Sequence, residues 1–438
     1  MWPICDPAGA LRSSPLWAGR VTRADGLDVR APVRLVTFAR RAMFEILLNH
    51  AANGLIPTSL VAKLVFLLVM TQLTILSVTL YLHRSQSHRS VDFHPALAHA
   101  FRFWCWLTTA MVTRDWVAIH RKHHAHCETE LDPHSPQMFG LGKLVFGGTE
   151  LYMAARADPD LRARFGRGTP DDWIERHLYT PHCNWGPTAL AVLELALFGV
   201  SGMAIWAVQM MWIPFWGAGV VNGVGHWWGY RNFETADRST NLSPLAIWIG
   251  GEELHNNHHA FPSSAKFSIR RFELDLGWLV IRVLAMLRLA RVKRIAASPR
   301  VQANDPIPAA RRPLQATLSD RVRVMTGYFR DVMLPALRDE SRRSRAGVLP
   351  LRLRHALANG GCWLDADERG RLNAWIETRP SLQTLCRFRA QLASLMEQRD
   401  SDSGARSLSQ WLRAAMDSDI GSLRRFAEAL AQEAPATR

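Results

Sequence analysis

The sequence predicts an all-α integral membrane protein, because it contains long apolar stretches and because its histidines follow helical spacing. Residues 55–82 form an apolar run of 28 residues, or roughly 42 Å as a helix, which is longer than a bilayer core requires. Residues 187–224 form a run of 38 residues, or roughly 57 Å, which is too long for one crossing and predicts a hairpin of two. Ser201-Gly202 is the expected turn of that hairpin.

Two further apolar stretches are less decisive. Residues 44–62 are interrupted by polar side chains, so that residues 44–82 hold either one long crossing or two short ones. Residues 95–112 carry His99 and Arg102 and are a marginal candidate.

Composition divides the chain into unlike parts. Residues 1–43 have no continuous apolar run, and we expect a flexible N-terminal segment without a signal peptide. Residues 44–294 hold the apolar stretches and form the expected membrane domain. Prolines punctuate an expected linker at 295–320, and residues 321–438 predict an Arg-rich helical region of unknown role.

The chain is strongly basic, with a net charge of +15 from 53 Lys and Arg against 38 Asp and Glu. Such a surface suits nucleic acid or anionic lipid. The apolar stretches favour lipid, because cytoplasmic segments of membrane proteins carry excess Lys and Arg. The six cysteines are scattered without a CxxC pair, which indicates a reducing compartment.

Eight of the 17 histidines lie in three dense clusters at the ends of apolar runs, namely His83 and His88; His120, His123 and His124; His255, His258 and His259. The second and third clusters have the i, i+3, i+4 spacing that places three imidazoles on one face of a helix. His83 and His88 are five residues apart, or about 140° on an ideal helix, so they converge only where the helix ends or distorts. Because imidazole binds iron, copper or zinc, the three clusters together predict a metal site.

Membrane topology constrains any site that uses all three clusters, because they must then lie on one side of the membrane. An even number of crossings must separate successive clusters, so residues 95–112 should lie at the interface and not cross. Basic residues beside the clusters place that side in the cytoplasm. These residues are Arg84, Arg89, Arg121, Lys122, Arg231 and Lys266.

Three histidines outside the clusters are ambiguous. His226 follows the second apolar run in the segment Asn222-Gly-Val-Gly-His226, and by itself it is an ordinary interfacial residue. His126 and His134 flank the second cluster, and the sequence does not decide whether they are metal ligands.

The three boxes HxxxxH, HxxHH and HxxHH resemble those of the integral-membrane fatty acid desaturases, and most of all the stearoyl-CoA-type delta-9 branch in its bacterial form. Supporting segments are residues 132–136 (DPHSP), residues 222–232 (NGVGHWWGYRN) and residues 250–268 (GGEELHNNHHAFPSSAKFS). The similarity runs from about residue 55 to residue 294.

The resemblance implies two iron ions held by nine histidines, which are His83, His88, His120, His123, His124, His226, His255, His258 and His259. It implies that Asn222 reaches one iron through water. It also implies four transmembrane helices in two hairpins under a cytosolic helical cap that holds the di-iron site, and hence two crossings within residues 44–82. The termini and the site are then cytoplasmic, and the expected location is the bacterial inner membrane.

The implied activity is that of an oxidoreductase with O2 as co-substrate. It introduces a cis double bond, at the delta-9 position, into a saturated fatty acyl chain by two hydrogen abstractions. The acyl carrier stays open between CoA, membrane lipid and acyl carrier protein, because Arg114-Asp115 lies farther from the second box than the Arg-Asp pair of animal enzymes. No HPGG segment typical of a fused cytochrome b5 occurs, so the resemblance implies a separate electron donor, such as ferredoxin or cytochrome b5 with an NAD(P)H reductase.

Three other functions compete with this one. A membrane di-iron hydroxylase of a fatty acid, alkane or sterol uses the same metals but inserts oxygen, and the DPHSP and NGVGH segments favour desaturation. A His-rich metal transporter would place its ligands within the membrane plane, whereas these clusters lie beyond the apolar runs. Nucleic-acid binding by residues 300–438 is not favoured, because the region has no recognisable fold motif.

Overall fold

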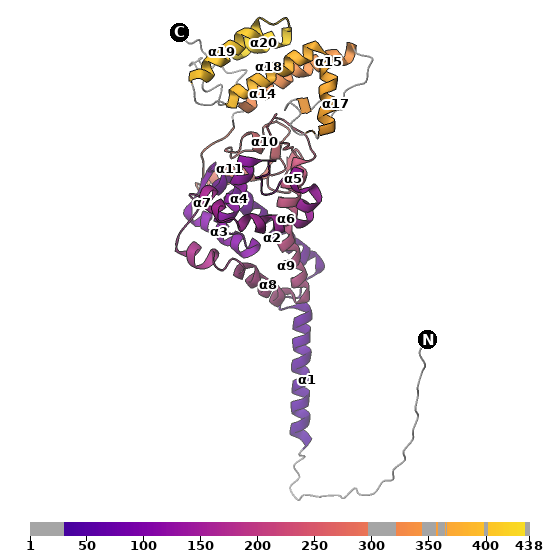
Figure 1. Ribbon diagram of the computed structural model, residues 1–438. Helices are drawn as coiled ribbons and strands as arrows, with labels where there is room; N and C mark the ends of the chain where they lie inside the picture. Colours follow the sequence, from indigo (N-terminus) through magenta and orange to yellow (C-terminus); the bar gives the residue numbers. More distant parts are fainter. Residues whose placement is uncertain are drawn as a thin grey trace, which may run out of the picture.

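The computed structural model describes residues 30–296, 321–343, 356–357, 364, 366–397 and 402–433, and these residues are mainly helical. Figure 1 shows a single helix, α1 (Arg30–Asn53), at one end, a helical body in the middle and a bundle of C-terminal helices at the opposite end. The expected linker at 295–320 lies outside the described residues, apart from its first two positions.

Two helices of the body are long and apolar enough to cross a membrane. The first has 28 residues and a mean hydropathy of 2.1, and it consists of α2 (Leu60–Ser77) and the π-helix η1 (Val78–Ser87). The second has 27 residues and a mean hydropathy of 1.4, and it consists of α9 (Val200–Ile213), the π-helix η3 (Pro214–Gly223) and the 3-10 turn η4 (Val224–His226). Length and composition identify both as candidate spans.

The two candidate spans start side by side. Lys63 Nζ donates a hydrogen bond of 2.7 Å to Ser201 Oγ, which joins the first turn of α2 to the first turn of α9 and gives the charged group a partner. Because both helices rise from this end, their far ends meet at the other. Those far ends carry His83 and His226.

The second apolar run forms the expected hairpin, but its arms are unequal. α8 (Trp185–Phe198) has 14 residues, which is about 21 Å of helix against about 30 Å of bilayer core. The turn is at Gly199, whose φ of 63° is a left-handed conformation that favours glycine. The expected turn at Ser201-Gly202 is wrong, because Gly202 lies inside α9, where a Cβ would overlap the carbonyl oxygen of Glu194.

α1 does not pair with α2 as a hairpin. It extends away from the body in Figure 1 and reaches it beside the α8–α9 turn, where Leu55 N donates to Ala196 O at 2.8 Å. The expected four crossings are therefore not confirmed, since two helices among the described residues qualify as candidate spans. Residues 30–43, expected to be part of a flexible segment, are helical, and residues 1–29 lie outside the described residues.

α3 (Pro95–Thr109) agrees with the expectation of an apolar segment that does not cross. It has 15 residues, or about 22 Å of helix, which is shorter than a bilayer core. Its buried Arg102 forms ion pairs of 2.6 Å with Asp172 and 3.6 Å with Glu175. A buried arginine needs such charged partners.

Short helices and two small sheets pack on the far ends of the spans. The helices are α4 (Thr113–His126), α5 (Pro136–Phe139), α6 (Leu141–Arg156), α7 (Pro159–Phe165), η2 (Glu175–Tyr179), α10 (His255–Ala260) and α11 (Leu276–Met286). β1 (Val91–Phe93) pairs antiparallel with β4 (Ala290–Val292), and β2 (Leu245–Ala246) pairs parallel with β3 (Leu274–Asp275).

Arg84 ties the end of the first span to this layer. It is fully buried and pairs with Asp275, 2.9 Å from Nη2 to Oδ1, and it also donates to the carbonyl oxygens of Ala265 and Gly250. A buried guanidinium needs acceptors of this kind. The contacts fix η1 against the segments on both sides of α10.

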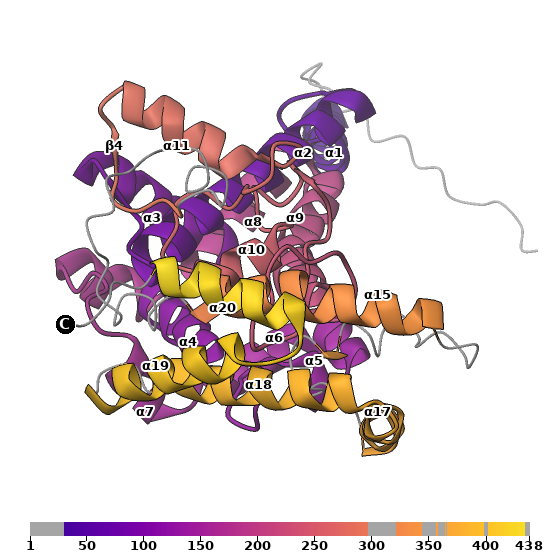
Figure 2. The same ribbon diagram turned by 90° about the horizontal axis from the view of Figure 1, so that it is seen from above.

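The C-terminal residues form a bundle with its own core, in agreement with the predicted helical region. Its helices are α14 (Arg321–Tyr328), η5 (Phe329–Met333), α15 (Leu334–Arg343), α17 (Ala366–Glu377), α18 (Pro380–Glu397), α19 (Asp402–Met416) and α20 (Gly421–Glu433). Figure 2 looks down on this bundle, which lies over α10 at the end opposite α1. It meets the body where Glu234 N donates to Thr326 Oγ1 at 2.9 Å.

Candidate metal centre

The π-helix η1 brings His83 and His88 together. An α-helix would hold them about 140° apart. In η1 the backbone bonds run between residues five apart, and His88 N donates to His83 O at 3.1 Å. The two ring centroids lie 4.9 Å apart, so the distortion that the five-residue spacing requires is present.

Five histidines from three elements form the first group. One ring nitrogen of each lies within 4.8 Å of the others, and the members are His83 and His88 of η1, His120 and His124 of α4, and His258 of α10. Three pairs of Nε2 atoms are in contact, at 3.0 Å for His83–His258, 2.8 Å for His88–His120 and 2.9 Å for His124–His258.

These separations fit nitrogens bound to one metal ion. Two nitrogens at about 2.05 Å from a metal are about 2.9 Å apart at a right angle and about 3.3 Å apart at a tetrahedral angle. The observed 2.8–3.0 Å is therefore close to the separations expected between neighbouring nitrogen ligands of one metal ion. His258 Nε2 also contacts the Nε2 atoms of His83 and His124. One ring nitrogen carries either one hydrogen or one lone pair, so hydrogen bonding alone does not explain both contacts.

The second group combines three histidines with a cysteine. One donor atom of each lies within 4.8 Å of the others, and the members are His123 of α4, Cys127 just after α4, His226 at the end of the second span and His259 of α10. His255 adjoins the group, with its Nε2 3.0 Å from His226 Nε2.

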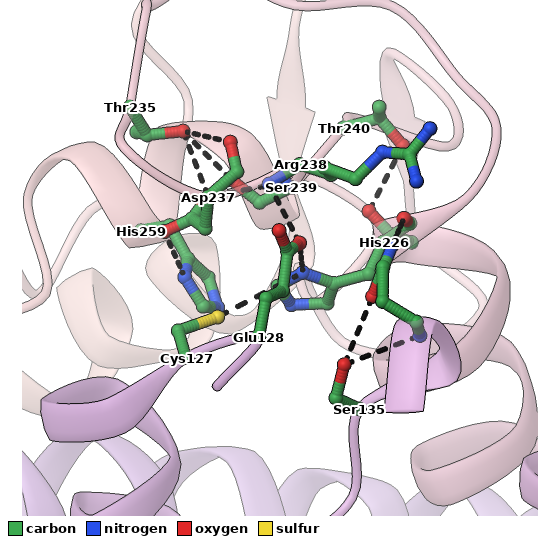
Figure 3. Close-up of polar contacts among 12 residues, drawn as sticks. Cys127, Glu128, Ser135, His226, Thr235, Asp237, Arg238, Ser239, Thr240 and His259 are labelled. Carbon is green, nitrogen blue, oxygen red and sulfur yellow. Dashed lines mark hydrogen bonds and ion pairs between the residues drawn. The ribbon is translucent and has the colours of Figure 1, made fainter. Parts of the chain in front are cut away.

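Four of these histidines contact a carboxylate through Nδ1, so that Nε2 faces the group. The contacts are His83 to Glu252 at 2.7 Å, His123 to Asp132 at 3.0 Å, His226 to Glu128 at 3.1 Å and His259 to Asp237 at 3.0 Å. Around metals such carboxylates fix the tautomer and the ring orientation. Figure 3 shows Glu128 beside His226 and Asp237 beside His259.

Burial keeps most of these imidazoles uncharged. Burial, with neighbouring histidines adding to it, lowers the pKa well below 6.5 for His88, His120, His124, His255 and His258. Burial also lowers the pKa of His259 to about 4, although Asp237 opposes this. At His123 burial is outweighed by Asp132, which raises the pKa. Neutral imidazole is the form that binds metal.

Three buried ring nitrogens of these histidines have no hydrogen-bond partner within the described part of the chain. They are Nδ1 of His255, Nδ1 of His258 and Nε2 of His259. A buried polar atom left unpaired costs about 1–3 kcal/mol. A cation in the second group would give His259 Nε2 a partner and remove that cost.

An apolar pocket adjoins the first group and reaches His255, which lies beside the second group. Its polar lining includes His83, His120, His255, Glu252 and Asn222. The apolar lining comes mainly from the two candidate spans and includes Ile75, Val78, Ile213, Trp216, Val221 and Ile249. Trp116 also lines the pocket and stacks on His120, with 5.0 Å between ring centroids and 13° between planes.

The structure brings the candidate site residues together. Eight of the nine candidate histidines fall in the two groups and His255 adjoins the second, while Asn222 lines the pocket. His126 lies outside both groups. His134 stacks on His123 with 4.5 Å between centroids, and burial lowers its pKa to about 3.

Sequence reasoning missed Cys127 and the four carboxylates. Asp132 and Glu252 carried a signal, because each lies in a segment that supported the resemblance. Glu128 and Asp237 lie on irregular backbone with no periodic spacing, and nothing in the sequence pointed to them.

Comparison with known proteins agrees with this site. Residues 58–294, more than half of the chain, match the family described as "Fatty acid desaturase". The sn-1 stearoyl-lipid 9-desaturase of Anabaena variabilis is 32% identical over 223 residues, which cover 50% of this chain and 79% of that protein. The delta-9 acyl-lipid desaturase 2 of Arabidopsis thaliana is 28% identical over 229 residues, 49% of this chain and 69% of that protein. An acyl-CoA 5-desaturase of Anemone leveillei is 32% identical over 228 residues, 48% and 65% of the two chains.

Proposed function

Because this chain belongs to the fatty acid desaturase family of oxidoreductases, we propose that it uses O2 to introduce a cis double bond, at the delta-9 position, into a saturated acyl chain of a membrane lipid. The observation that carries this proposal is the apolar pocket lined by His83 and His120 of the first group and by His255 beside the second. An acyl chain needs an apolar channel, and breaking an unactivated C–H bond needs a strong oxidant next to that channel. The pocket supplies the apolar channel, and metal ions held by the histidines can supply the oxidant.

The carrier and the position of the double bond rest on the relatives. The proteins from Anabaena variabilis and Arabidopsis thaliana are both named as 9-desaturases of lipids, while the protein from Anemone leveillei is named for acyl-CoA and position 5. Membrane lipid is therefore the preferred carrier, with acyl-CoA and acyl carrier protein as alternatives. Delta-9 is the preferred position on the same ground.

The histidines fit two iron ions. The first group would hold one, and the other would be held by His123, His226, His255 and His259, with Asn222 acting through a water molecule. When bound, the iron pair supplies the oxidising power that activates O2 and removes hydrogen from two neighbouring carbons.

The chain's own side chains prepare this chemistry. Glu252 and Asp237 hold a proton on Nδ1 of His83 and His259, which leaves the Nε2 lone pairs for metal. Trp116 fixes the plane of His120 by stacking. The apolar pocket walls hold methylene groups in van der Waals contact and exclude water from the reacting carbons.

The membrane arrangement follows from the two spans and the basic residues near their histidine ends. Arg84, Arg89 and Arg121 lie on or beside the elements that carry the first group, so the proposed site faces the cytoplasm. The proposed location is the bacterial inner membrane. Electrons then come from a separate cytoplasmic donor, such as ferredoxin or cytochrome b5 with its NAD(P)H reductase.

The test is a lipid profile. The full chain is expressed in a host that lacks delta-9 desaturation, and the fatty acids are separated by gas chromatography with mass-spectrometric location of the double bond. We expect new cis-9 monounsaturated chains, and we expect His120→Ala to reduce them below detection. His177→Ala is the matched control, because His177 is exposed and belongs to neither group.

Three outcomes would contradict the proposal in different ways. Hydroxylated chains without new double bonds would make the chain a hydroxylase. A double bond at another carbon would refute only the delta-9 position. Unchanged lipids from an iron-loaded, folded protein supplied with electrons would refute desaturation.

A further inference from the structure

Cys127 places a thiol in the second histidine group, where the proposed function gives it no role. It follows α4 directly, and its φ of −49° and ψ of 128° turn the backbone out of the helix. Its Sγ lies 3.9 Å from His123 Nε2 and 3.9 Å from His226 Nδ1. Figure 3 shows the sulfur between the rings of His226 and His259.

The separation from His123 is close to that of two ligands on one metal. A sulfur at about 2.3 Å and a nitrogen at about 2.05 Å from a metal are about 3.1 Å apart at a right angle and about 3.5 Å apart at a tetrahedral angle. The observed 3.9 Å exceeds these values by less than 1 Å. A small shift of the Cys127 side chain would close that gap.

The turn after Cys127 holds the thiol at this place. Glu128 has a left-handed φ of 60°, which is uncommon for a residue other than glycine. Its N–H donates to Asp132 Oδ2 at 2.7 Å, and its carboxylate accepts from Arg238 N at 2.7 Å. These bonds keep the strained backbone in place and prevent Cys127 from turning away.

A second observation at the same place points to a ligand. His259 is 8% exposed, and its Nε2 has no hydrogen-bond partner among the described residues, while Asp237 occupies its Nδ1. A donor atom of His259 and the Cys127 sulfur belong to the same group within 4.8 Å. An unpaired imidazole nitrogen beside a thiol is the donor set of a mixed nitrogen and sulfur metal site.

Another cysteine shows what simple packing looks like. Cys105 is 1% exposed and lies against Tyr81 and Leu82 in an apolar cluster. It belongs to none of the metal-binding groups among the described residues. Cys127, in contrast, contacts an imidazole nitrogen of His123 and one of His226.

We propose that Cys127 is a further metal ligand, and that its sulfur joins His123, His226, His255 and His259 at the second metal position. The proposal rests on the proposed function in assuming that this position holds a metal ion. On binding, the S–H bond breaks, a metal–sulfur bond forms and the proton leaves to solvent. The two positions then differ, because the first carries only nitrogen donors and the second carries a negatively charged sulfur, which favours the more oxidised metal.

Cobalt(II) tests this directly, because a cobalt–thiolate bond gives an intense charge-transfer absorption that cobalt–imidazole bonds lack. The full chain in detergent is loaded with cobalt, and the bound metal is counted. We expect the charge-transfer band in the native chain and its loss in Cys127→Ser, with bound cobalt retained at the first position. Cys386→Ser, which removes a thiol from the C-terminal bundle, should leave the band unchanged.

A measurement on the unaltered chain covers the case in which Cys127→Ser does not fold. Metal-loaded and metal-depleted protein are alkylated, and the modified cysteines are found by mass spectrometry. We expect the metal to protect Cys127 and to leave labelling of Cys386 unchanged.

The ligand proposal is overturned if protein with two bound cobalt ions has no charge-transfer band, or if Cys127 is labelled equally with and without metal. Neither result bears on whether the chain introduces double bonds. Conversely, a band in a chain that forms no double bonds would leave the cysteine ligand intact and refute the proposed function alone.

Discussion

Carboxylates beside the histidines decide which ring nitrogen faces the metal groups. Histidine has two similar nitrogens, and spacing along a helix does not select between them. In this chain Glu252, Asp132 and Asp237 each take the Nδ1 of one histidine, and Glu128 takes that of His226. The Nε2 atoms are left to converge, and their mutual distances match neighbouring ligands.

Replacement of Asp132 by Asn tests this orientation. Burial opposes the charge on Asp132, but His123 outweighs burial and lowers the pKa of the carboxyl, so the native group is ionised. The amide has the same shape without the charge, and we expect metal affinity to fall by about 10- to 100-fold. The metal affinity is measured by competition with a chelator of known affinity. Asp92→Asn, at an exposed ion pair with Lys293, is the control, and equal affinities in both variants would rule the orientation role out.

The grouping of the histidines could be expected from the sequence for a physical reason. Three side chains at helical spacing, such as His120, His123 and His124, indicate a shared helix face by their positions alone. The spacing does not reveal that His123 serves the second group while the other two serve the first. Asp237 could not be predicted at all, because an irregular loop delivers it to His259 from 22 residues upstream.

At the scale of elements, the π-helix η1 is the feature that makes the first group possible. Its wider turn places His83 and His88 on one side, and His88 N bonds to His83 O. π-Helices often arise where one residue has been inserted into an α-helix, and they cluster at functional sites. The five-residue spacing predicted a distortion, but its type could not be read from side chains alone.

Deletion of Gln86 would remove the extra residue. We expect the segment to return to α-helical register and His88 to leave the first group, so that bound metal falls from two ions toward one per chain, measured by elemental analysis of purified protein. Gln86→Ala is the matched control, because it keeps the chain length and the Gln86 carbonyl that accepts from Arg121 Nη2. Full metal content after the deletion would show that the π-helix is not needed.

The number of crossings was harder to predict than the site. Hydropathy identified residues 55–82 and 187–224, but it measures length and composition without showing where a chain reverses. Reversal at Gly199 leaves α8 with 14 residues, and α1 does not return along α2. Gly202 does not form a turn. Its lack of a side chain instead lets α9 lie close to the backbone of α8 at Glu194.

At the scale of the whole molecule, the described C-terminal helices have a hydrophobic core that is separate from the clusters of the body. The bundle core is built from residues between 324 and 430, including Tyr328, Leu385 and Trp411, and the clusters of the body contain none of them. The domain boundary that we expect after residue 294, from the change in composition, stays a prediction. The composition could not predict that the bundle would lie over α10 or that Thr326 would accept a hydrogen bond from Glu234 N.

The contact between these parts suggests how strongly the metal site depends on the bundle. The hydrogen bond from Glu234 N to Thr326 Oγ1 adjoins the Asp237 loop, and the charge of Arg389 in the bundle acts on the Glu234 carboxyl. A single hydrogen bond contributes only about 0.5–1.5 kcal/mol. The Asp237 loop is held mainly from within the body, where Ser239 N donates to Asp237 Oδ1 and Arg238 N donates to Glu128 Oε1. The metal groups should therefore survive loosening of the bundle.

Trp411→Ala tests this independence. Trp411 is 4% exposed, and its Nε1 donates to Phe388 O, so its loss should destabilise the bundle by about 3–5 kcal/mol. We expect faster hydrogen exchange across residues 321–433, measured by mass spectrometry, with unchanged exchange in α4 and α10 and unchanged bound metal. Trp106→Ala, which removes a similarly buried tryptophan from α3, should show the reverse pattern of exchange. Loss of metal from the Trp411 variant would instead make the bundle a necessary support of the site, acting through the Glu234 contact.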